Sequence, residues 1–251
     1  MINETFDNKS RPVITAASFY GEQQHICDTA IATFSRVVFS EILERFEHEQ
    51  IGEISSANRV KPIYLLNVNG RDTAFYLSEI GSSSSSNDMV DVNWKTGADR
   101  FIFFGSAGAL DNNATRGRYV IPTEAYRDEG MSYHYAPPSD YIKIKNSDAL
   151  TGIFDKLHLP YVAGRVWSTD AIYRETENNV VKRRSDGCIA VEMELAGLQA
   201  VSDYHGFELY DFLVTGDVLD GDDYDCVGLN GANHDLDKFF VAASVLKELD
   251  K

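Results

Sequence analysis

The stretch that decides the fold is F-I-F-F-G-S-A-G, Phe101 to Gly108, near the middle of the 251-residue chain. Its apolar run, Phe101–Phe104, predicts a central parallel strand, because such strands are buried on both faces. The small residues Gly105-Ser106-Ala107-Gly108 predict a tight turn. Ligands of open α/β sheets bind beyond the carboxyl ends of strands, so this turn either cradles an anion or hydroxyl group with its N–H groups or is only structural.

Strand and helix patterns alternate on both sides of this run. Upstream, Arg36–Phe39 predicts a short buried strand, and Ser40–Glu49 predicts a helix capped by Ser40. Asn69-Gly70, between two β-rich runs, is a strong hairpin signal. The alternation predicts an α/β fold: a single domain with a central mixed β-sheet flanked by helices. Further strands are expected at Lys61–Val68, Asp72–Ser78, Tyr119–Pro122, Tyr161–Trp167 and Glu208–Thr215, and helices at Ala190–Ser202 and His234–Lys251.

The N-terminus and a serine run have compositions of their own. Residues 1–20 lack a sustained period and are expected to form an extension before the domain at 21–251. Gly81 precedes five serines, Ser82–Ser86. The run is either a flexible linker or a tight turn into the helix-like stretch Asp88–Thr96, and the flanking patterns favour the turn.

The charge balance limits the kind of partner. The chain has 39 Asp and Glu residues against 23 Lys and Arg residues, a net charge of −16, whereas proteins that bind nucleic-acid backbones need a basic surface. A general nucleic-acid-binding role is therefore excluded, but a local basic pocket for one small anion is not. The sequence shows no signal peptide and no apolar run of about 18 residues, so we expect no membrane partner and a cytoplasmic location.

The cysteines do not form a recognisable framework. Cys27, Cys188 and Cys226 are far apart and make no CxxC pair. This spacing argues against a disulfide framework and against a zinc cage. We therefore expect reduced thiols and no metal.

Two acidic motifs are candidates for chemistry. V-E-M-E-L, Val191 to Leu195, places two glutamates at the start of an expected helix, about 200° apart, so that one of them points into the fold. Thr215-Gly216-Asp217 ends an apolar strand, where a carboxylate is either an active-site acid or the cap of a turn. Each motif alone is also what a solvated helix start or a turn looks like.

Five motifs follow one another in an order that resembles the nucleoside phosphorylase family, which holds the purine nucleoside and uridine phosphorylases and the methylthioadenosine nucleosidases. The resemblance runs from about His25 to the C-terminus and implies that family's α/β fold. The motifs are F-F-G-S-A-G-A-L (Phe103–Leu110), R-D-E-G-M-S-Y-H-Y (Arg127–Tyr135), W-S-T-D-A-I-Y (Trp167–Tyr173), V-E-M-E (Val191–Glu194) and Asp217, 23 positions after Glu194.

The resemblance implies roles for these residues in cleaving an N-glycosidic bond. Glu194 would accept hydrogen bonds from the ribose hydroxyls, and Met193 would lie under the sugar. Asp217 would protonate N7 of a purine as general acid. Asp217 therefore indicates a purine, whereas the Arg127–Tyr135 loop resembles the uridine branch. The remaining substrate-binding residues implied by the resemblance are Gly105, Ser106, Ile172, Tyr173 and Glu192.

Two residues resemble those that family members lend to a neighbouring subunit. His25 corresponds to a histidine near a neighbour's 5′-hydroxyl site, and Arg59 to an arginine that crosses a dimer interface to phosphate. The resemblance thus implies a homodimer or a hexamer built as a trimer of dimers. His134 is expected to be structural.

The phosphate site departs from the family pattern. The family's G-D-P-x-R is replaced by F-S-E-I-L-E-R, so that its arginine falls on Glu44, or on Arg45 after a shift of one, and Phe103 stands where a second arginine is usual. The tentative phosphate residues are therefore Arg59, Arg45 and Ser106, with Arg174 as a further candidate. The breadth of the resemblance favours phosphorolysis, with phosphate as co-substrate and no other cofactor. Hydrolysis and non-catalytic nucleoside binding or storage are the alternatives.

Overall fold

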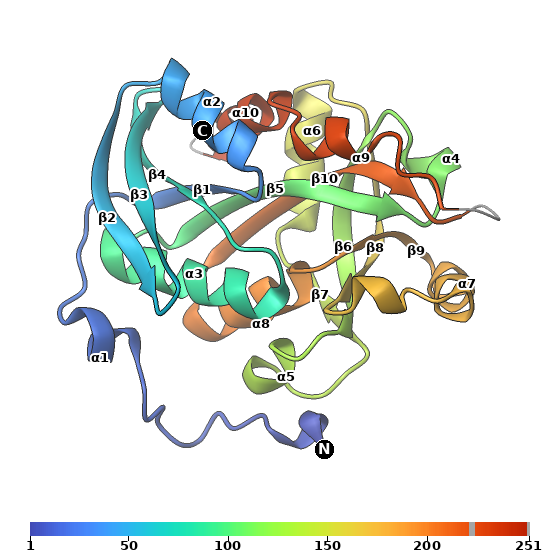
Figure 1. Cartoon of the computed structure of the whole chain (residues 1–251), viewed down its shortest axis with the longest axis horizontal. Coiled ribbons are helices and arrows are strands. Elements are labelled where there is room, and N and C mark those ends of the chain that lie inside the picture. Colours follow the sequence, from blue (N-terminus) through green and yellow to red (C-terminus); the bar gives the residue numbers. More distant parts are fainter. Residues whose placement is uncertain (221–223, 250–251) are drawn as a thin grey trace.

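One mixed sheet of ten strands organises the chain in a computed structural model that describes residues 1–220 and 224–249 (Figure 1). The expected α/β fold with a central mixed sheet is confirmed. The strands are β1 (Thr29–Thr33), β2 (His48–Ser56), β3 (Arg59–Val68), β4 (Arg71–Leu77), β5 (Arg100–Ala109), β6 (Tyr119–Asp128), β7 (Tyr141–Lys143), β8 (Tyr161–Thr169), β9 (Cys188–Glu192) and β10 (Glu208–Val218).

Five of the strands close into a ring. β5 is parallel to β10, β10 is antiparallel to β6, β6 and β9 both run parallel to β8, and β9 returns antiparallel to β5. From β5 the sheet continues through β1, β4 and β3 to β2, and β7 pairs with β6. β5 is therefore the strand that joins the ring to the rest of the sheet.

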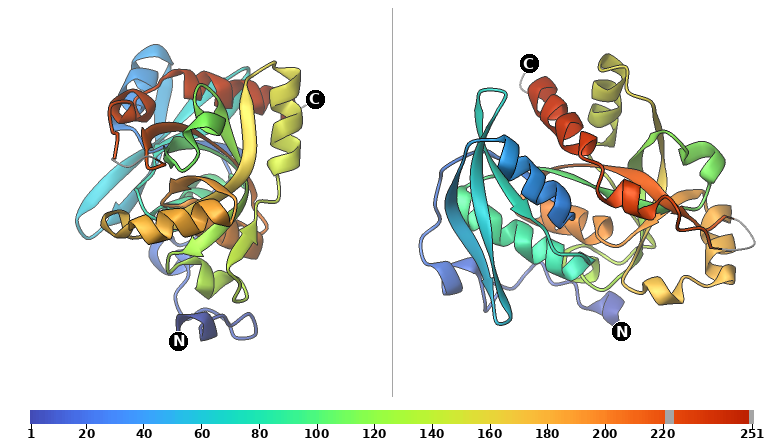
Figure 2. Two further views of the ribbon diagram at one scale, coloured as in Figure 1. Left: turned by 90° about the vertical axis from the view of Figure 1, so that its right-hand side faces the viewer. Right: turned by 45° about the horizontal axis from the view of Figure 1, so that its top comes forward.

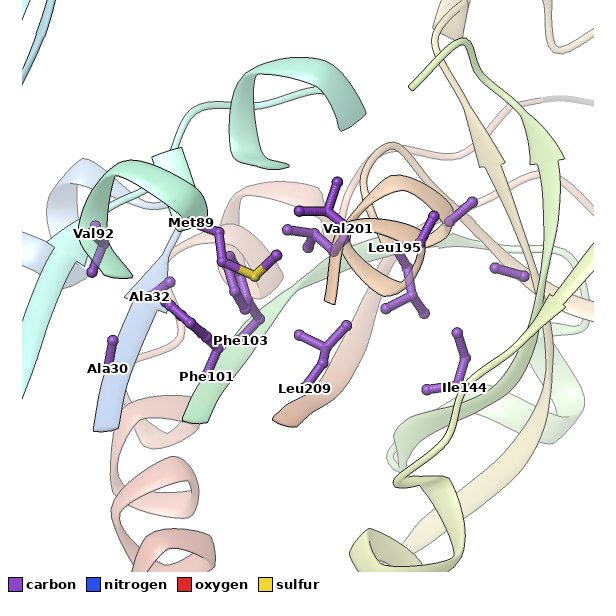
Figure 3. Close-up of a cluster of buried hydrophobic side chains, with 14 of the residues drawn as sticks. Ala30, Ala32, Met89, Val92, Phe101, Phe103, Ile144, Leu195, Val201 and Leu209 are labelled. Carbon is purple, nitrogen blue, oxygen red and sulfur yellow. The ribbon is translucent and has the colours of Figure 1, made fainter. Parts of the chain in front are cut away.

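Helices cover both faces of the sheet (Figures 1 and 2). On one face, Met89 of α3 and Leu195 of α8 pack in one core with Phe101 and Phe103 of the sheet (Figure 3). Helices α2, α6 and α10 cover the other face. The helices are α1 (Ala16–Tyr20), α2 (Arg36–Arg45), α3 (Ser82–Thr96), α4 (Asn112–Thr115), α5 (Ser132–Tyr135), α6 (Ser147–Lys156), α7 (Glu177–Ser185), α8 (Leu195–His205), α9 (Leu229–Asn233) and α10 (Asp237–Leu249), with short 3₁₀ turns η1 (Ile2–Glu4) and η2 (Ile172–Arg174).

The apolar run Phe101–Phe104 is the central strand that the sequence predicts, with all four side chains buried. Side chains of a strand alternate between its faces, so Phe101 and Phe103 join the α3/α8 core while Ile102 and Phe104 join the α2/α10 core. Phe103 packs against Phe34 with a centroid separation of 5.8 Å. Its aromatic ring is thus a core element, which explains why no arginine stands there.

The small residues after this run do not form the expected turn. Gly105–Gly108 stay in β5, because β10 pairs with this strand from Arg100 to Ala109. Gly108 is closely packed, because a Cβ atom there would lie 2.5 Å from Leu219 Cδ1, whereas one at Gly105 would make an ordinary contact with Leu213 Cδ2 at 3.4 Å.

The expected strand at Arg36–Phe39 is wrong. These residues are the first turns of α2, which Ser35 caps by accepting a hydrogen bond from Val38 N at 3.2 Å. The β-branched pair in R-V-V-F favours a strand locally, but the cap determines the structure. The buried strand is β1 instead, and β2 occupies the end of the helix expected at Ser40–Glu49.

The V-E-M-E motif also differs from its expected helical form. Glu192 ends β9, and α8 begins only at Leu195. The argument that the two glutamates lie 200° apart on one helix therefore fails. The serine run is neither a linker nor a turn, because Ser82–Ser86 form the first turns of α3. The hairpin at Asn69-Gly70 is confirmed, with φ values of 55° and 85°.

Residues 1–20 cross the surface as an extended segment with η1 and α1 (Figure 1). Thr5 donates a hydrogen bond to the Tyr133 carbonyl of α5 at 3.1 Å, and Tyr20 donates to Asp91 of α3 at 3.0 Å. The boundary between this extension and the domain stays a prediction. None of the described helices is long and apolar enough to span a membrane.

Candidate active site

A cavity of about 1160 Å³ lies at the carboxyl ends of β1, β5, β9 and β10. It brings together eight residues that the sequence analysis assigned to substrate or catalysis: Gly105, Ser106, Ile172, Tyr173, Glu192, Met193, Glu194 and Asp217.

The cavity opens where β5 loses a neighbour. β1 pairs with β5 only as far as Phe104, and β9 pairs with it only from Gly108. On this side Gly105–Ala107 therefore have no strand partner among the described residues, and all three line the cavity. The small residues at 105–108 thus border the cavity from inside the strand. Their role in cradling an anion or hydroxyl group stays a prediction.

The two glutamates of V-E-M-E play different structural parts. Glu192 is buried, and its Oε2 accepts hydrogen bonds from the backbone N–H groups of Glu194 and Leu195, each at 2.7 Å, while its other oxygen bonds Ser168. It thereby satisfies the first N–H groups of α8. Glu194 is half-buried and accepts from Gly81 N at 2.7 Å. Glu192 therefore fixes the turn, and Glu194 is the glutamate whose carboxylate borders the cavity.

Asp217 and Glu175 form a second acidic part of the cavity lining. Burial raises the pKa of Asp217, which accepts a hydrogen bond from Tyr224 Oη at 3.0 Å. A Cβ atom on Gly108 would lie 3.4 Å from Asp217 Oδ2, so that glycine makes space for the carboxylate. Glu175, which the sequence analysis did not single out, lines the same wall. A carboxyl group with a raised pKa can carry a proton near neutral pH.

A further part of the cavity is basic and comes from two separate segments. Arg36 begins α2, and Lys238 lies in α10 with only 2% of its surface exposed. Lys238 Nζ donates to the carbonyls of Gly105 at 3.2 Å and Ala232 at 2.5 Å. Burial lowers its pKa to about 8, so it remains largely charged at neutral pH. No carboxylate of the described residues forms an ion pair with Lys238.

Polar side chains extend this basic end. Ser35 Oγ and His234 Nδ1 are 2.8 Å apart, and Ser106 donates a hydrogen bond to Asn233. Asn233 and His234 reach the cavity because α9 packs closely on β10. A Cβ atom on Gly216 would lie 2.7 Å from Ala232 Cβ. The sequence analysis singled out Ser106 but missed Ser35, Asn233 and His234, because they stand in no motif.

A family model covers most of these residues. The phosphorylase superfamily model matches residues 28–240, a range that includes every residue named above as lining the cavity. The chain belongs to the phosphorylase superfamily. The resemblance drawn from the sequence motifs is therefore confirmed at the level of the family.

Relatives within the superfamily match about half of the chain or slightly more. A guanosine phosphorylase of Halorubrum lacusprofundi is 27% identical over 157 residues, 60% of this chain and 63% of the relative. A purine nucleoside phosphorylase (DeoD-type 1) of Shewanella oneidensis is 28% identical over 129 residues, 50% of this chain and 55% of the relative. The chain thus aligns with less than two-thirds of either relative.

Solved structures of the superfamily share the fold over nearly the whole chain. An AMP nucleosidase of Bacteroides thetaiotaomicron has a TM-score of 0.69 at 19% identity, covering 90% of this chain and 89% of the other. A futalosine hydrolase of Helicobacter pylori has a TM-score of 0.70 at 17% identity, covering 89% and 98%. The superfamily therefore includes proteins named as phosphorylases and proteins named as nucleosidases or hydrolases.

The other expected site residues of this superfamily member lie outside the cavity. Arg45, with Glu44, is exposed at the far end of α2 and pairs with Glu41 at 3.2 Å. Arg59 pairs with Glu79 at 2.5 Å. His25 is largely exposed and lies 3.5 Å from Asp28, and Arg174 is exposed as well. Within one chain Arg36 lines the cavity and Arg45 does not, because the N-terminal end of α2 faces it. The phosphate role expected for Arg45 stays a prediction. The roles of His25 and Arg59 toward a neighbouring subunit stay predictions.

The Arg127–Tyr135 motif supports the site from outside the cavity. Arg127 is buried and donates to Ser132 Oγ at 2.7 Å and to the Pro137 carbonyl at 2.6 Å. Glu129 in turn accepts a hydrogen bond from Ser82 at 2.9 Å, next to Gly81, which bonds Glu194. The loop therefore fixes the start of α3 beneath the glutamate turn.

The Ile172-Tyr173 pair of the W-S-T-D-A-I-Y motif lies at the mouth of the cavity. Ile172 and Tyr173 belong to η2, and Tyr173 is 97% exposed. Among the described residues, no group of three or more His, Cys, Asp and Glu side chains is placed to hold a metal ion.

The glutamate pair is expected to make the folded chain less stable as the pH rises. Burial, and then the charge of Glu192, raise the pKa of Glu194 above its ordinary value of 4.5. The folded state therefore holds a proton that the unfolded state has lost, and stability falls from about pH 4.5 upward. We expect a lower Tm at pH 8 than at pH 5.5 by scanning fluorimetry. Glu194→Gln should reduce this decline, and an identical decline in the variant would contradict the assignment.

Proposed function

We propose that the chain cleaves the N-glycosidic bond of a purine nucleoside by phosphorolysis, giving the free base and ribose 1-phosphate. The observation that carries the proposal is that Glu194 and Asp217 line one cavity together with the basic side chains of Arg36 and Lys238. A sugar acceptor, an acid for the leaving base and a site for an anion are the three elements that such a reaction needs.

Glu194 and Asp217 take different parts in bond cleavage. The Glu194 carboxylate accepts hydrogen bonds from the ribose hydroxyls and stabilises the positive charge that develops on the sugar. Met193 provides an adaptable apolar surface under the ribose. Asp217 delivers a proton to N7 of the purine, so that the base leaves as a neutral molecule. Burial supports this role, since it raises the pKa of Asp217.

The basic end supports phosphate as the nucleophile. Arg36 and Lys238 contribute two positive charges, and the hydroxyl group of Ser106 and the ring of His234 line the same end. Ser35 caps α2, so the N-terminal end of that helix adds a favourable field for an anion. Arg36 and Lys238 are not among the phosphate residues expected from the sequence, whereas Ser106 is.

Hydrolysis by water is the second candidate. It is favoured by the location of Arg45 and Arg59, which pair with Glu41 and Glu79 outside the cavity. If Lys238 and Arg36 serve only to hold the fold or to orient water, free ribose is the product.

The experiment is base release from inosine, adenosine, methylthioadenosine and uridine, each with and without phosphate. Phosphorolysis requires phosphate and gives ribose 1-phosphate, whereas hydrolysis gives ribose in phosphate-free buffer. Binding of nucleosides without turnover would contradict both.

Arg36→Ala is expected to raise the KM for phosphate at least about tenfold, because a charge-assisted contact contributes roughly 1.5–3 kcal/mol. The nucleoside KM should change much less. Arg45→Ala, in the same helix but outside the cavity, is the matched control. A phosphate KM that responds to Arg59→Ala and not to Arg36→Ala would show that a neighbouring subunit supplies the anion site.

A further inference from the structure

Glu175 is a second carboxyl group beside Asp217 that the proposed reaction leaves without a role. It is half-buried and lines the cavity on the same wall. Its carboxylate accepts no hydrogen bond from the described residues, and it forms no ion pair with them. A carboxylate that is partly removed from water without a partner is destabilised, which indicates that a ligand group satisfies it.

The backbone holds Glu175 in a fixed place. Its N–H donates to the Ile172 carbonyl at 3.3 Å at the end of η2, and Thr176 N donates to the Arg174 carbonyl at 2.8 Å. Thr176 is then the N-cap of α7. The residue therefore sits between two ordered turns, so its carboxylate projects from a defined position of the cavity wall.

The surroundings of Glu175 are rich in acceptors. The groups that line this end are Asp217 from β10, Tyr224 and Asp220 after it, and Glu177 and Arg184 from α7. The Tyr224 hydroxyl is used by Asp217, and Arg184 donates to the Asp220 carbonyl at 3.1 Å. Burial, and then the charge of Asp217, raise the pKa of Glu175 to about 7. Two neighbouring carboxyl groups of this kind tend to share one proton near neutral pH.

We propose that Glu175 is a specificity-determining residue that accepts a hydrogen bond from the exocyclic amino group of a 6-aminopurine nucleoside, while Asp217 contacts N7 of the same base. The proposal rests on the proposed cleavage of purine nucleosides. It narrows the substrate class to purines that carry an amino group at C6.

The chemistry of the purine edge gives the reason. A 6-aminopurine presents an acceptor at N7 next to N–H donors at C6. One protonated and one charged carboxyl group match this pair. A 6-oxopurine presents two adjacent acceptors, so the charged carboxylate would face an oxygen atom. Sites that leave a buried polar group unpaired discriminate strongly against the mismatched substrate.

Adenosine and inosine test this proposal, because adenosine carries an amino group at C6 and inosine carries an oxo group there. At pH 7.5 the wild-type chain should cleave adenosine with a kcat/KM at least about tenfold above that for inosine. Glu175→Gln, whose amide can donate to an oxo group, should lower this ratio by about tenfold or more. Glu49→Gln removes a charge of the same sign from an exposed position of β2, outside the cavity, and is the matched control. Its ratio should stay within about twofold of the wild type.

Calorimetric binding of adenine and hypoxanthine separates this proposal from the proposed function. If neither nucleoside is cleaved, the proposed function fails, but tighter binding of adenine that is lost in Glu175→Gln still supports the recognition. Glu175→Asp, which keeps the charge on a shorter side chain, should retain part of the preference. Equal use or binding of the amino and oxo compounds by the wild type would overturn the proposal, as would equal effects of the Glu175 and Glu49 variants.

Discussion

Asp217→Asn is expected to lower base release from a purine nucleoside by about 10²–10⁴-fold, the range typical of losing a general acid. The asparagine side chain keeps the size of the aspartate and can still receive the hydrogen bond from Tyr224. It cannot deliver a proton to N7. Steady-state kinetics of adenosine cleavage in saturating phosphate measures the loss, with circular dichroism to show that the variant folds.

The control for Asp217 is a substrate whose leaving group needs no proton, such as a nitrophenyl riboside. Its cleavage should fall far less than that of the nucleoside. Equal losses on both substrates would mean that Asp217 holds the cavity wall, next to Gly108 and Tyr224, and transfers no proton.

Glu194→Gln is expected to lower base release at least about tenfold, because one charge-assisted hydrogen bond contributes roughly 1.5–3 kcal/mol. The amide preserves a carbonyl oxygen that can accept from Gly81, whose N–H lies 2.7 Å from the native carboxylate. What is lost is the ionised form of Glu194, whose negative charge faces the developing cation of the sugar; because the pKa of Glu194 is raised to about 8, the loss should grow as the assay pH rises toward 8. The same assay measures the loss, and a fully active Glu194→Gln would refute the assignment.

A matched variant distinguishes the two glutamates. Glu192→Gln should act mainly on stability, because its carboxylate accepts from Glu194 N and Leu195 N and so holds the start of α8. A 2′-deoxynucleoside, which lacks one of the hydroxyl donors, should lose less activity in Glu194→Gln than the ribonucleoside does. An equal loss would place the effect of Glu194 away from the sugar.

Local patterns predicted the fold where local and long-range preferences agree. The apolar run Phe101–Phe104 and the hairpin at Asn69-Gly70 were of this kind. Arg36–Phe39 misled because two β-branched residues favour a strand, while the cap at Ser35 is visible only once β1 is known. The glutamate turn misled for a similar reason. Its helical period starts at Leu195, and Glu192 belongs to a strand whose neighbours lie far away in the sequence.

Some residues of the candidate site could be predicted from the sequence and others could not. Glu194 and Asp217 stand in recognisable motifs, so the resemblance to the family was enough to single them out. Arg36, Glu175 and Lys238 stand in no motif. Each becomes a site candidate only because α2 and α10 begin, and η2 ends, at one cavity. Their signal is spatial, and no periodicity or spacing in the sequence carries it.

The opening beside Gly105–Ala107 has a consequence for synthesis of the chain. The residues that line it extend along the sequence from Thr33 to Lys238. The Gly105 carbonyl accepts its hydrogen bond from Lys238 only once α10 has been synthesised. Contacts of such long range form late in folding. A nascent chain that ends at Asp217 already contains the sugar and base residues, but it lacks the helix that closes the anion end. We therefore expect release of such a chain from the ribosome to yield no nucleoside-cleaving activity.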